Sequence, residues 1–180
     1  PRPDSRRQTE RAEAMPTVLH PILGELDPSA PGFWDTTLTF AGRTITFDLT
    51  IDGSGLTGPD LNDLPRQLED LVPFDRAARF AILRDAQARD DDAASTLYLT
   101  HHGSELPTAD LQRLFGTDKP GSADPEAMLS RLVLVRVGLY PEHEDRRVLL
   151  DYSIDPDVTH YLLCVSFDAA RQPTAVALES

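Results

Sequence analysis

The chain of 180 residues has almost no cysteine and no long apolar run. Its single cysteine, Cys164, cannot form a disulfide within the chain, so an oxidising compartment is not favoured. A helix that spans a bilayer needs about 18 or more consecutive apolar residues, and a secretion signal needs a shorter apolar core behind basic residues. Neither pattern is recognisable. These features predict a cytoplasmic protein that does not enter a membrane.

Basic residues are also scarce. The 17 Lys and Arg stand against 30 Asp and Glu, which gives a formal net charge of -13 and a pI near 4.6. A surface of this sign repels phosphate backbones and anionic lipid headgroups. The composition therefore disfavours nucleic acid and membrane partners, and it favours a basic protein partner.

The first residues differ in composition from the rest. Residues 1–14 hold four arginines and no large apolar side chain, whereas an apolar run starts at Val18. We expect residues 1–14 to be a disordered leader, with Met15 as the true start. A chain of the remaining length can bury a substantial core, so residues 15–180 are predicted to form a single α+β domain.

A hairpin is the first element that the pattern predicts. Residues 33–40 and 43–51 alternate between apolar and polar side chains, and residues 41–42 are Ala-Gly. Pairing Leu38 with Ile45 gathers the apolar side chains on one face of the hairpin. Those side chains are Trp34, Leu38, Phe40, Ile45, Phe47, Leu49 and Ile51. The run from Ile22 to Leu26 is expected to add a third strand beside it.

Helical spacing follows in the middle of the chain. After a Gly- and Asp-rich loop at residues 52–60, an apolar spacing typical of a helix begins, and a second helix with Asp75 as its N-cap is expected to end near Arg89. Two shorter helices are predicted at Thr108 to Phe115 and from Asp124 to Ser130. The helical spacing that begins directly after the loop at residues 52–60 consists of Leu61, Leu64, Leu68 and Leu71. The run Leu97 to Leu99 is short enough to suit a strand or a helix.

The last third reads as four strands separated by turns. Their short connections predict an antiparallel meander. Strands, then helices, then strands without β-α-β alternation indicate an α+β fold. The expected strands are Leu132 to Tyr140, Arg147 to Ile154, His160 to Phe167 and Thr174 to Leu178.

Several segments together resemble a known family. They are Leu23 to Leu26 (LGEL), Leu97 to Leu106 (LYLTHHGSEL), Asp151 to Ile154 (DYSI) and Asp157 to Asp168 (DVTHYLLCVSFD), with the terminal Glu-Ser. Their order is similar to that of an uncharacterised bacterial family, the domain of unknown function numbered two thousand and four. The resemblance implies a helix over residues 97–106 and a small cytoplasmic protein, and similar domains occur among immunity proteins that neutralise bacterial toxins. It implies no active site.

Metal-binding patterns are incomplete. His101 and Glu105 would share one face of a helix with His102 beside them, but two ligands are too few for a catalytic zinc. Residues 142–145 (EHED) place four potential ligands in one turn, where adjacent side chains seldom converge on one ion. We predict no metal and no cofactor.

Nucleophilic catalysis is not favoured either. His160 precedes Cys164 by four residues, which in a strand separates them by about 13 Å. The Asp52-Gly53-Ser54-Gly55 segment lacks the distal glutamate of a calcium loop and the lysine of a phosphate-binding loop. A buried, inert thiol and a plain loop are the predictions.

Two functions remain. The favoured one is a non-enzymatic, acidic protein-binding module, in its most concrete form an immunity-type protein that neutralises a bacterial toxin. The alternative is a metal-dependent hydrolase that uses His101, His102, His143 and distant carboxylates. The residues predicted to contact the partner are Asp90, Asp91, Asp92, Asp151, Tyr152, Asp155 and Asp157.

Overall fold

The computed structural model describes residues 17–20, 22–53, 56, 60, 71–88, 90–119 and 124–180. The leader expected at residues 1–14, the start at Met15 and the apolar spacing at Leu61, Leu64 and Leu68 lie outside these residues, as does most of the loop at 52–60. Among the described helices, none is both long and apolar enough to cross a membrane.

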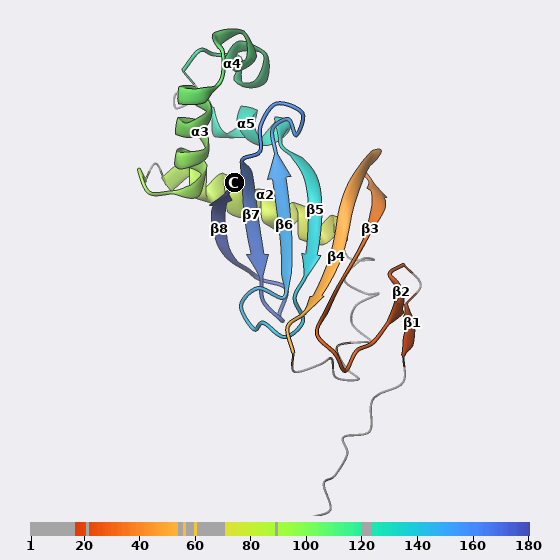
Figure 1. Ribbon diagram of the computed structural model, residues 1–180. Coiled ribbons are helices and arrows are strands. Elements are labelled where there is room, and N and C mark those ends of the chain that lie inside the picture. Colours follow the sequence, from red (N-terminus) through yellow and green to blue (C-terminus); the bar gives the residue numbers. More distant parts are fainter. Residues whose placement is uncertain are drawn as a thin grey trace, which may run out of the picture.

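The described residues form an α+β fold with a two-stranded and a six-stranded sheet (Figure 1). The strands are β1 (Val18–His20), β2 (Gly24–Leu26), β3 (Gly32–Phe40), β4 (Arg43–Ile51), β5 (Val133–Leu139), β6 (Val148–Ser153), β7 (Leu162–Phe167) and β8 (Pro173–Glu179). The helices are α2 (Leu71–Ala88), α3 (Ala94–Glu105), α4 (Thr108–Phe115) and α5 (Pro125–Arg131).

The two predicted groups of strands join into one sheet with the order β3-β4-β5-β6-β7-β8. The C-terminal meander β5 to β8 is antiparallel, but β4 and β5 are parallel, so the sheet as a whole is mixed. The chain leaves the end of β4, passes through the helices and re-enters at the start of β5, which makes those two strands run the same way. The expected pair of separate antiparallel units is thus corrected to a single mixed sheet.

The β3-β4 hairpin is confirmed. Leu38 pairs with Ile45, as the alternation predicted. Ala41 and Gly42 both have positive φ, 48° and 76°, which is the backbone of a type I′ turn and matches the twist of the strands. The third strand predicted beside the hairpin is wrong, because β2 pairs with β1 in a separate sheet. The β1-β2 turn is held by His20, whose Nδ1 accepts the N–H groups of Ile22 and Leu23.

The short helices begin and end where their capping residues predict. Gly116 closes α4 with φ 72°, and the Asp124 carboxylate accepts the Ala127 N–H at the start of α5. The segment that was open to either assignment is helical, within α3. Asp75 lies inside α2 and is not its N-cap. Its carboxylate instead binds Arg79, one turn further along the helix.

The core lies between the helices and one face of the sheet (Figure 1). Phe74 of α2 packs edge-on against Phe167 of β7, with ring centroids 4.9 Å apart. Arg79 donates to the carbonyls of Leu129 and Leu132 and so holds α5 against α2. Alternate residues of the central strands, Leu150 in β6 and Val165 in β7 among them, are fully buried on this side.

The opposite face of the sheet carries a buried charge cluster centred on Arg136 of β5. Its Nε and Nη2 donate to the two oxygens of Asp48 in β4 at 2.6 and 2.9 Å, and its Nη1 donates to Asp151 in β6 at 2.8 Å. Tyr140 Oη lies 2.7 Å from Nη2. Between them Gly138 leaves room, because a Cβ there would lie 2.8 Å from the Arg136 guanidinium. The Arg136 side chain thus bridges three adjacent strands.

This cluster, which we call the Arg136 clamp, is largely withdrawn from water. The side chains of Asp48 and Asp151 are 1% and 6% exposed, and that of Arg136 is 29% exposed. Burial by itself lowers the pKa of Arg136, but its bonds to Asp48, Asp151 and Tyr140 outweigh burial and raise it. The guanidinium therefore stays charged and bonds to both buried carboxylates, so it offsets one of their two negative charges.

We predict that Arg136→Met lowers the free energy of unfolding by about 3 kcal/mol, because two buried carboxylates lose their counter-charge. Urea denaturation measures this. The matched control is Arg43→Met, which removes an exposed arginine from the same sheet and is expected to cost less than about 0.5 kcal/mol. Equal costs for the two variants would contradict the assigned role.

Candidate functional site

The acidic turn of Asp90, Asp91 and Asp92 connects α2 to α3, and all three residues are exposed. The Asp90 carbonyl accepts the Ala93 N–H, and one oxygen of its carboxylate accepts the Asp92 N–H at 3.1 Å. No ion pair neutralises these carboxylates within the described residues. The three charges are therefore presented to solvent, as the sequence predicted.

Asp155 and Asp157 lie in the connection between β6 and β7. Asp155 forms an ion pair of 2.9 Å with Arg113 of α4, and its other oxygen accepts the Asp157 N–H. Asp157 is exposed. Of this pair, only Asp157 presents a carboxylate that no arginine neutralises within the described residues.

Asp151 and Tyr152 are buried, so the contact role predicted for them is wrong in this fold. Asp151 belongs to the Arg136 clamp. Tyr152 is 0% exposed, and its hydroxyl donates to Asp75 at 2.8 Å. Burial, and next the charge of Asp75, raise the pKa of Tyr152. Both side chains stabilise the interior, because β6 is a central strand covered on both faces.

The acidic candidates do not form one patch. The acidic turn adjoins the start of α3, whereas Asp155 contacts α4, which follows the other end of α3 (Figure 1). A helix of 12 residues is about 18 Å long. The acidic turn and Asp157 are thus separate features of the surface.

The histidines of α3 have structural partners. His102 is 1% exposed, and its Nδ1 donates to the Tyr98 carbonyl at 2.7 Å, which leaves a buried Nε2 without a partner among the described residues. Burial lowers the pKa of His102. His101 stacks on Tyr161, whose hydroxyl donates to Glu105. The potential metal ligands His101 and Glu105 therefore both contact Tyr161.

The potential metal ligands in the turn after β5 also form hydrogen bonds within the protein. His143 Nε2 donates to Asp52 at 2.6 Å, and the Glu142 carboxylate accepts the N–H groups of Asp52 and Gly53. These bonds close the loop that follows β4. In the part of the chain that is described, no group of three or more His, Cys, Asp or Glu side chains could hold a metal ion.

Cys164 is buried on β7 directly opposite Asp151. Burial, and then the neighbouring Asp151 carboxylate, raise the pKa of the Cys164 thiol. A reactive cysteine requires the opposite, a stabilised thiolate. The prediction of an inert thiol agrees with these surroundings.

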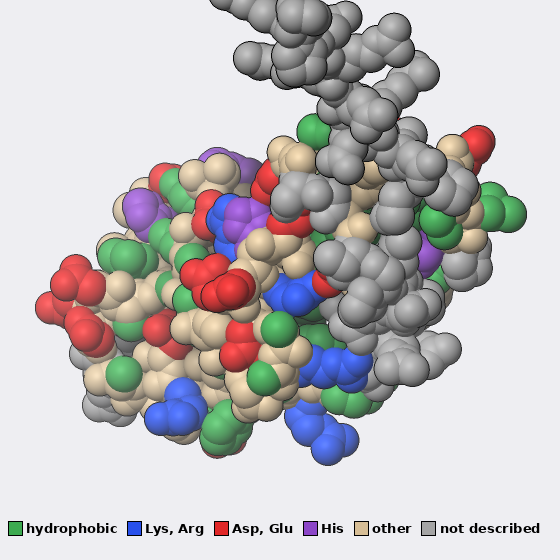
Figure 2. Space-filling model, turned by 90° about the horizontal axis from the view of Figure 1, so that it is seen from below, with side chains coloured by type: hydrophobic (Ala, Val, Ile, Leu, Met, Phe, Trp, Pro, Cys, Tyr) green, Lys and Arg blue, Asp and Glu red, His purple; other side chains and the backbone are tan. Residues whose placement is uncertain are grey.

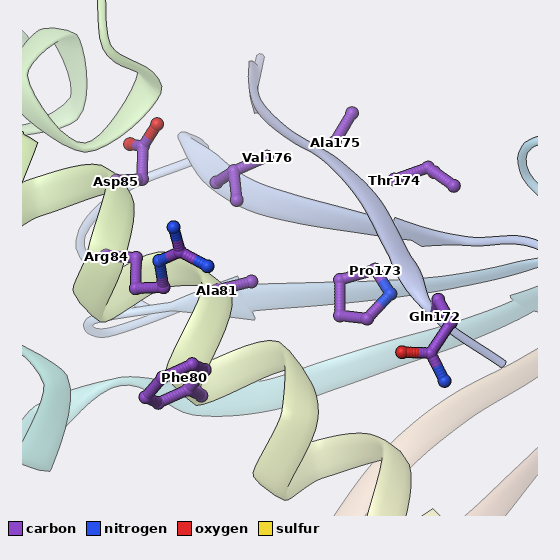
Figure 3. A pocket seen from close by; sticks show the side chains of 9 residues that line it. All are labelled: Phe80, Ala81, Arg84, Asp85, Gln172, Pro173, Thr174, Ala175 and Val176. Atoms are coloured by element: carbon purple, nitrogen blue, oxygen red, sulfur yellow. The ribbon is translucent and has the colours of Figure 1, made fainter.

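A groove that the sequence did not reveal lies between α2 and β8 (Figure 3). It has a volume of about 530 Å³. Its walls are Phe80, Ala81, Arg84 and Asp85 on α2 and residues 172–176 at the start of β8. The signal that could have found its helical wall is the spacing of Phe80 and Arg84, which lie four residues apart on α2.

Comparisons with models of protein families, with curated proteins and with solved structures found no match to this chain. The resemblance to the bacterial domain of unknown function rests on the sequence segments quoted above.

We predict that His102 makes stability fall in acid. Its pKa is lowered in the folded chain, so the unfolded chain binds the extra proton. The stabilisation is present above the unfolded pKa of about 6.5 and is lost as pH falls below it. Between about pH 7.5 and pH 5.5, urea denaturation should show roughly 1 kcal/mol more loss for the natural chain than for His102→Leu. Parallel pH profiles would contradict this.

Proposed function

We propose that this protein is a non-enzymatic, acidic protein-binding module that engages a basic protein through the acidic turn Asp90–Asp92. The observation that carries the proposal is how charge is divided between the interior and the surface. The buried or half-buried carboxylates of Asp48, Asp75 and Asp151 face Arg136 or Arg79. The two arginines thus bond to all three carboxylates and offset most of their charge.

The excess of negative charge is left on the surface. Among the described residues, exposed acidic side chains outnumber exposed basic ones. On the face drawn in Figure 2, a group of acidic side chains stands out at the left end of the view, apart from the Arg and Lys side chains. Charge of one sign at an exposed turn accelerates association with a partner of opposite sign.

The neighbouring contacts support a fixed position for the acidic turn. Asp85 near the end of α2 accepts the Ser95 N–H at 2.8 Å, and the Ser95 hydroxyl contacts the Ile82 carbonyl. These bonds link the two helices on either side of the turn. A turn that is held in place loses less conformational entropy on binding than a mobile one.

Neutralisation of a bacterial toxin in the cytoplasm is the concrete form of the proposal. It draws on the family resemblance and on the charge, because enzymes that act on nucleic acids are commonly basic where they bind phosphate. In this form the acidic turn would steer the module to the toxin and cover its active site. No contact among the described residues favours the alternative of a metal-dependent hydrolase.

We predict that Asp91→Asn/Asp92→Asn slows association with the basic partner several-fold, because charge on the contact surface governs the association rate. The partner is first isolated by low-salt affinity capture and purified, and its rate constants are measured by surface plasmon resonance. The control Glu144→Gln/Asp145→Asn removes the same charge from exposed residues after β5.

The control variant should associate nearly as fast as the natural chain, and rising salt should slow the natural chain most steeply. If the two variants slow association equally, total charge and not the acidic turn is responsible. An association rate constant that is the same for the natural chain and both variants, and that does not change with salt, would overturn the proposal.

A further inference from the structure

The last strand of the sheet has an open edge. β8 pairs only with β7, so the backbone N–H and C=O groups on its other side have no strand partner in the described part of the chain. Natural sheets usually protect such an edge with charges, proline or a bulge. Here Pro173 and a register shift protect the start, and Glu179 lies at the end. The stretch between them, Thr-Ala-Val-Ala-Leu, carries no charge and no proline.

The groove described above runs beside this open edge. Pro173, Thr174 and Ala175 are exposed where they line it. Figure 3 shows Ala81 and Arg84 of α2 across from this part of β8. A strand added to β8 would place every second side chain on the side of the sheet where α2 lies.

Beyond the groove, apolar and basic side chains alternate along the exposed side of α2. A second hollow, of about 430 Å³, is lined by Val72, Pro73, Arg76, Ala77 and Phe80, so the two hollows share Phe80. Val72 and Phe80 are 60% and 62% exposed. Arg76 and Arg84 flank Phe80 at a spacing of four residues, which places all of them on one side of the helix. We call Val72, Arg76, Phe80 and Arg84 the α2 stripe.

The charges of the α2 stripe define its ligand. The side chains of Arg76 and Arg84 make no ion pair or hydrogen bond with any described residue, although the chain has a net charge of -13. Asp85, the carboxylate among the described residues that line the groove, accepts the Ser95 N–H instead. Two exposed arginines on either side of an exposed phenylalanine complement a segment that presents carboxylates next to apolar side chains.

We infer that the groove between α2 and β8 binds an extended segment of a partner protein, which adds as a strand to β8. On its helix-facing side this segment alternates apolar side chains, which contact Phe80, with Asp or Glu, which pair with Arg76 and Arg84. The ligand inferred here is acidic, whereas the partner proposed for the acidic turn is basic, so this inference does not depend on that proposal.

The probe is the peptide Val-Thr-Glu-Thr-Val-Thr-Glu-Thr. In an extended strand, its valine and glutamate side chains alternate along one side and its threonines lie on the other. Titration into the isotope-labelled full chain should shift the backbone amide signals of residues 173–176 and the side-chain signals of Arg84. A peptide with lysine in place of glutamate should not shift them. Arg84→Glu should weaken binding of the first peptide roughly tenfold, because an attraction becomes a repulsion.

The matched control is Arg43→Glu, which makes the same charge change at an exposed arginine on β4 and should leave binding unchanged. Both variants change exposed side chains, and equal melting temperatures will confirm that both fold. Absence of shifts in β8 at millimolar peptide, or equal binding by Arg84→Glu, would overturn the inference. Shifts of the same amides on raising the protein concentration without peptide would assign the edge to a second copy of the chain and also overturn it.

Discussion

The Arg136 guanidinium is the interaction on which the six-stranded sheet depends. The hairpin β3-β4 and the meander β5 to β8 are each stabilised by short connections, and they become one sheet where β4 lies parallel to β5. No local turn sets that register. Arg136 bonds to Asp48 on one side and to Asp151 on the other, with separations of 88 and 15 residues along the chain. The Arg136 clamp therefore favours the one alignment in which Arg136 bonds to both Asp48 and Asp151.

The same use of arginine explains how so acidic a chain folds. Arg79 pairs with Asp75 and donates to two carbonyls at the end of α5, and Arg147 binds Asp60. Burying a carboxylate without a partner is costly, so the few basic residues are most effective inside. Repulsion among the remaining surface carboxylates is tolerated because water and salt screen it. A surface with excess negative charge is the result, and the proposed function rests on it.

Local patterns predicted the local structure well. The hairpin and its Leu38–Ile45 register, the α4 and α5 caps and the four strands of the meander depend on alternation, turns and capping residues within a few positions. The parallel junction depends on contacts between distant segments, so it could not be read locally. The β1-β2 pairing is local, and it was missed because the run from Ile22 to Leu26 was assigned to the β3-β4 hairpin instead of to a turn and strand of its own. For the candidate site, the exposure of Asp90, Asp91 and Asp92 was predicted correctly. Asp151 and Tyr152 were predicted to contact a partner because a tyrosine beside acidic residues suits a polar contact, but in the fold they bond to Arg136 and Asp75 in the interior.

The central claim is that the Arg136 clamp joins the hairpin to the meander, and native-state hydrogen exchange of Arg136→Met tests it most directly. Amides that open in cooperative units report the stability of each unit separately. If the claim is right, the amides of β3 and β4 lose more protection than those of β6 and β7, because the hairpin is released while the meander remains. If protection falls equally throughout the sheet, or does not fall in β4, Arg136 does not hold the two parts together.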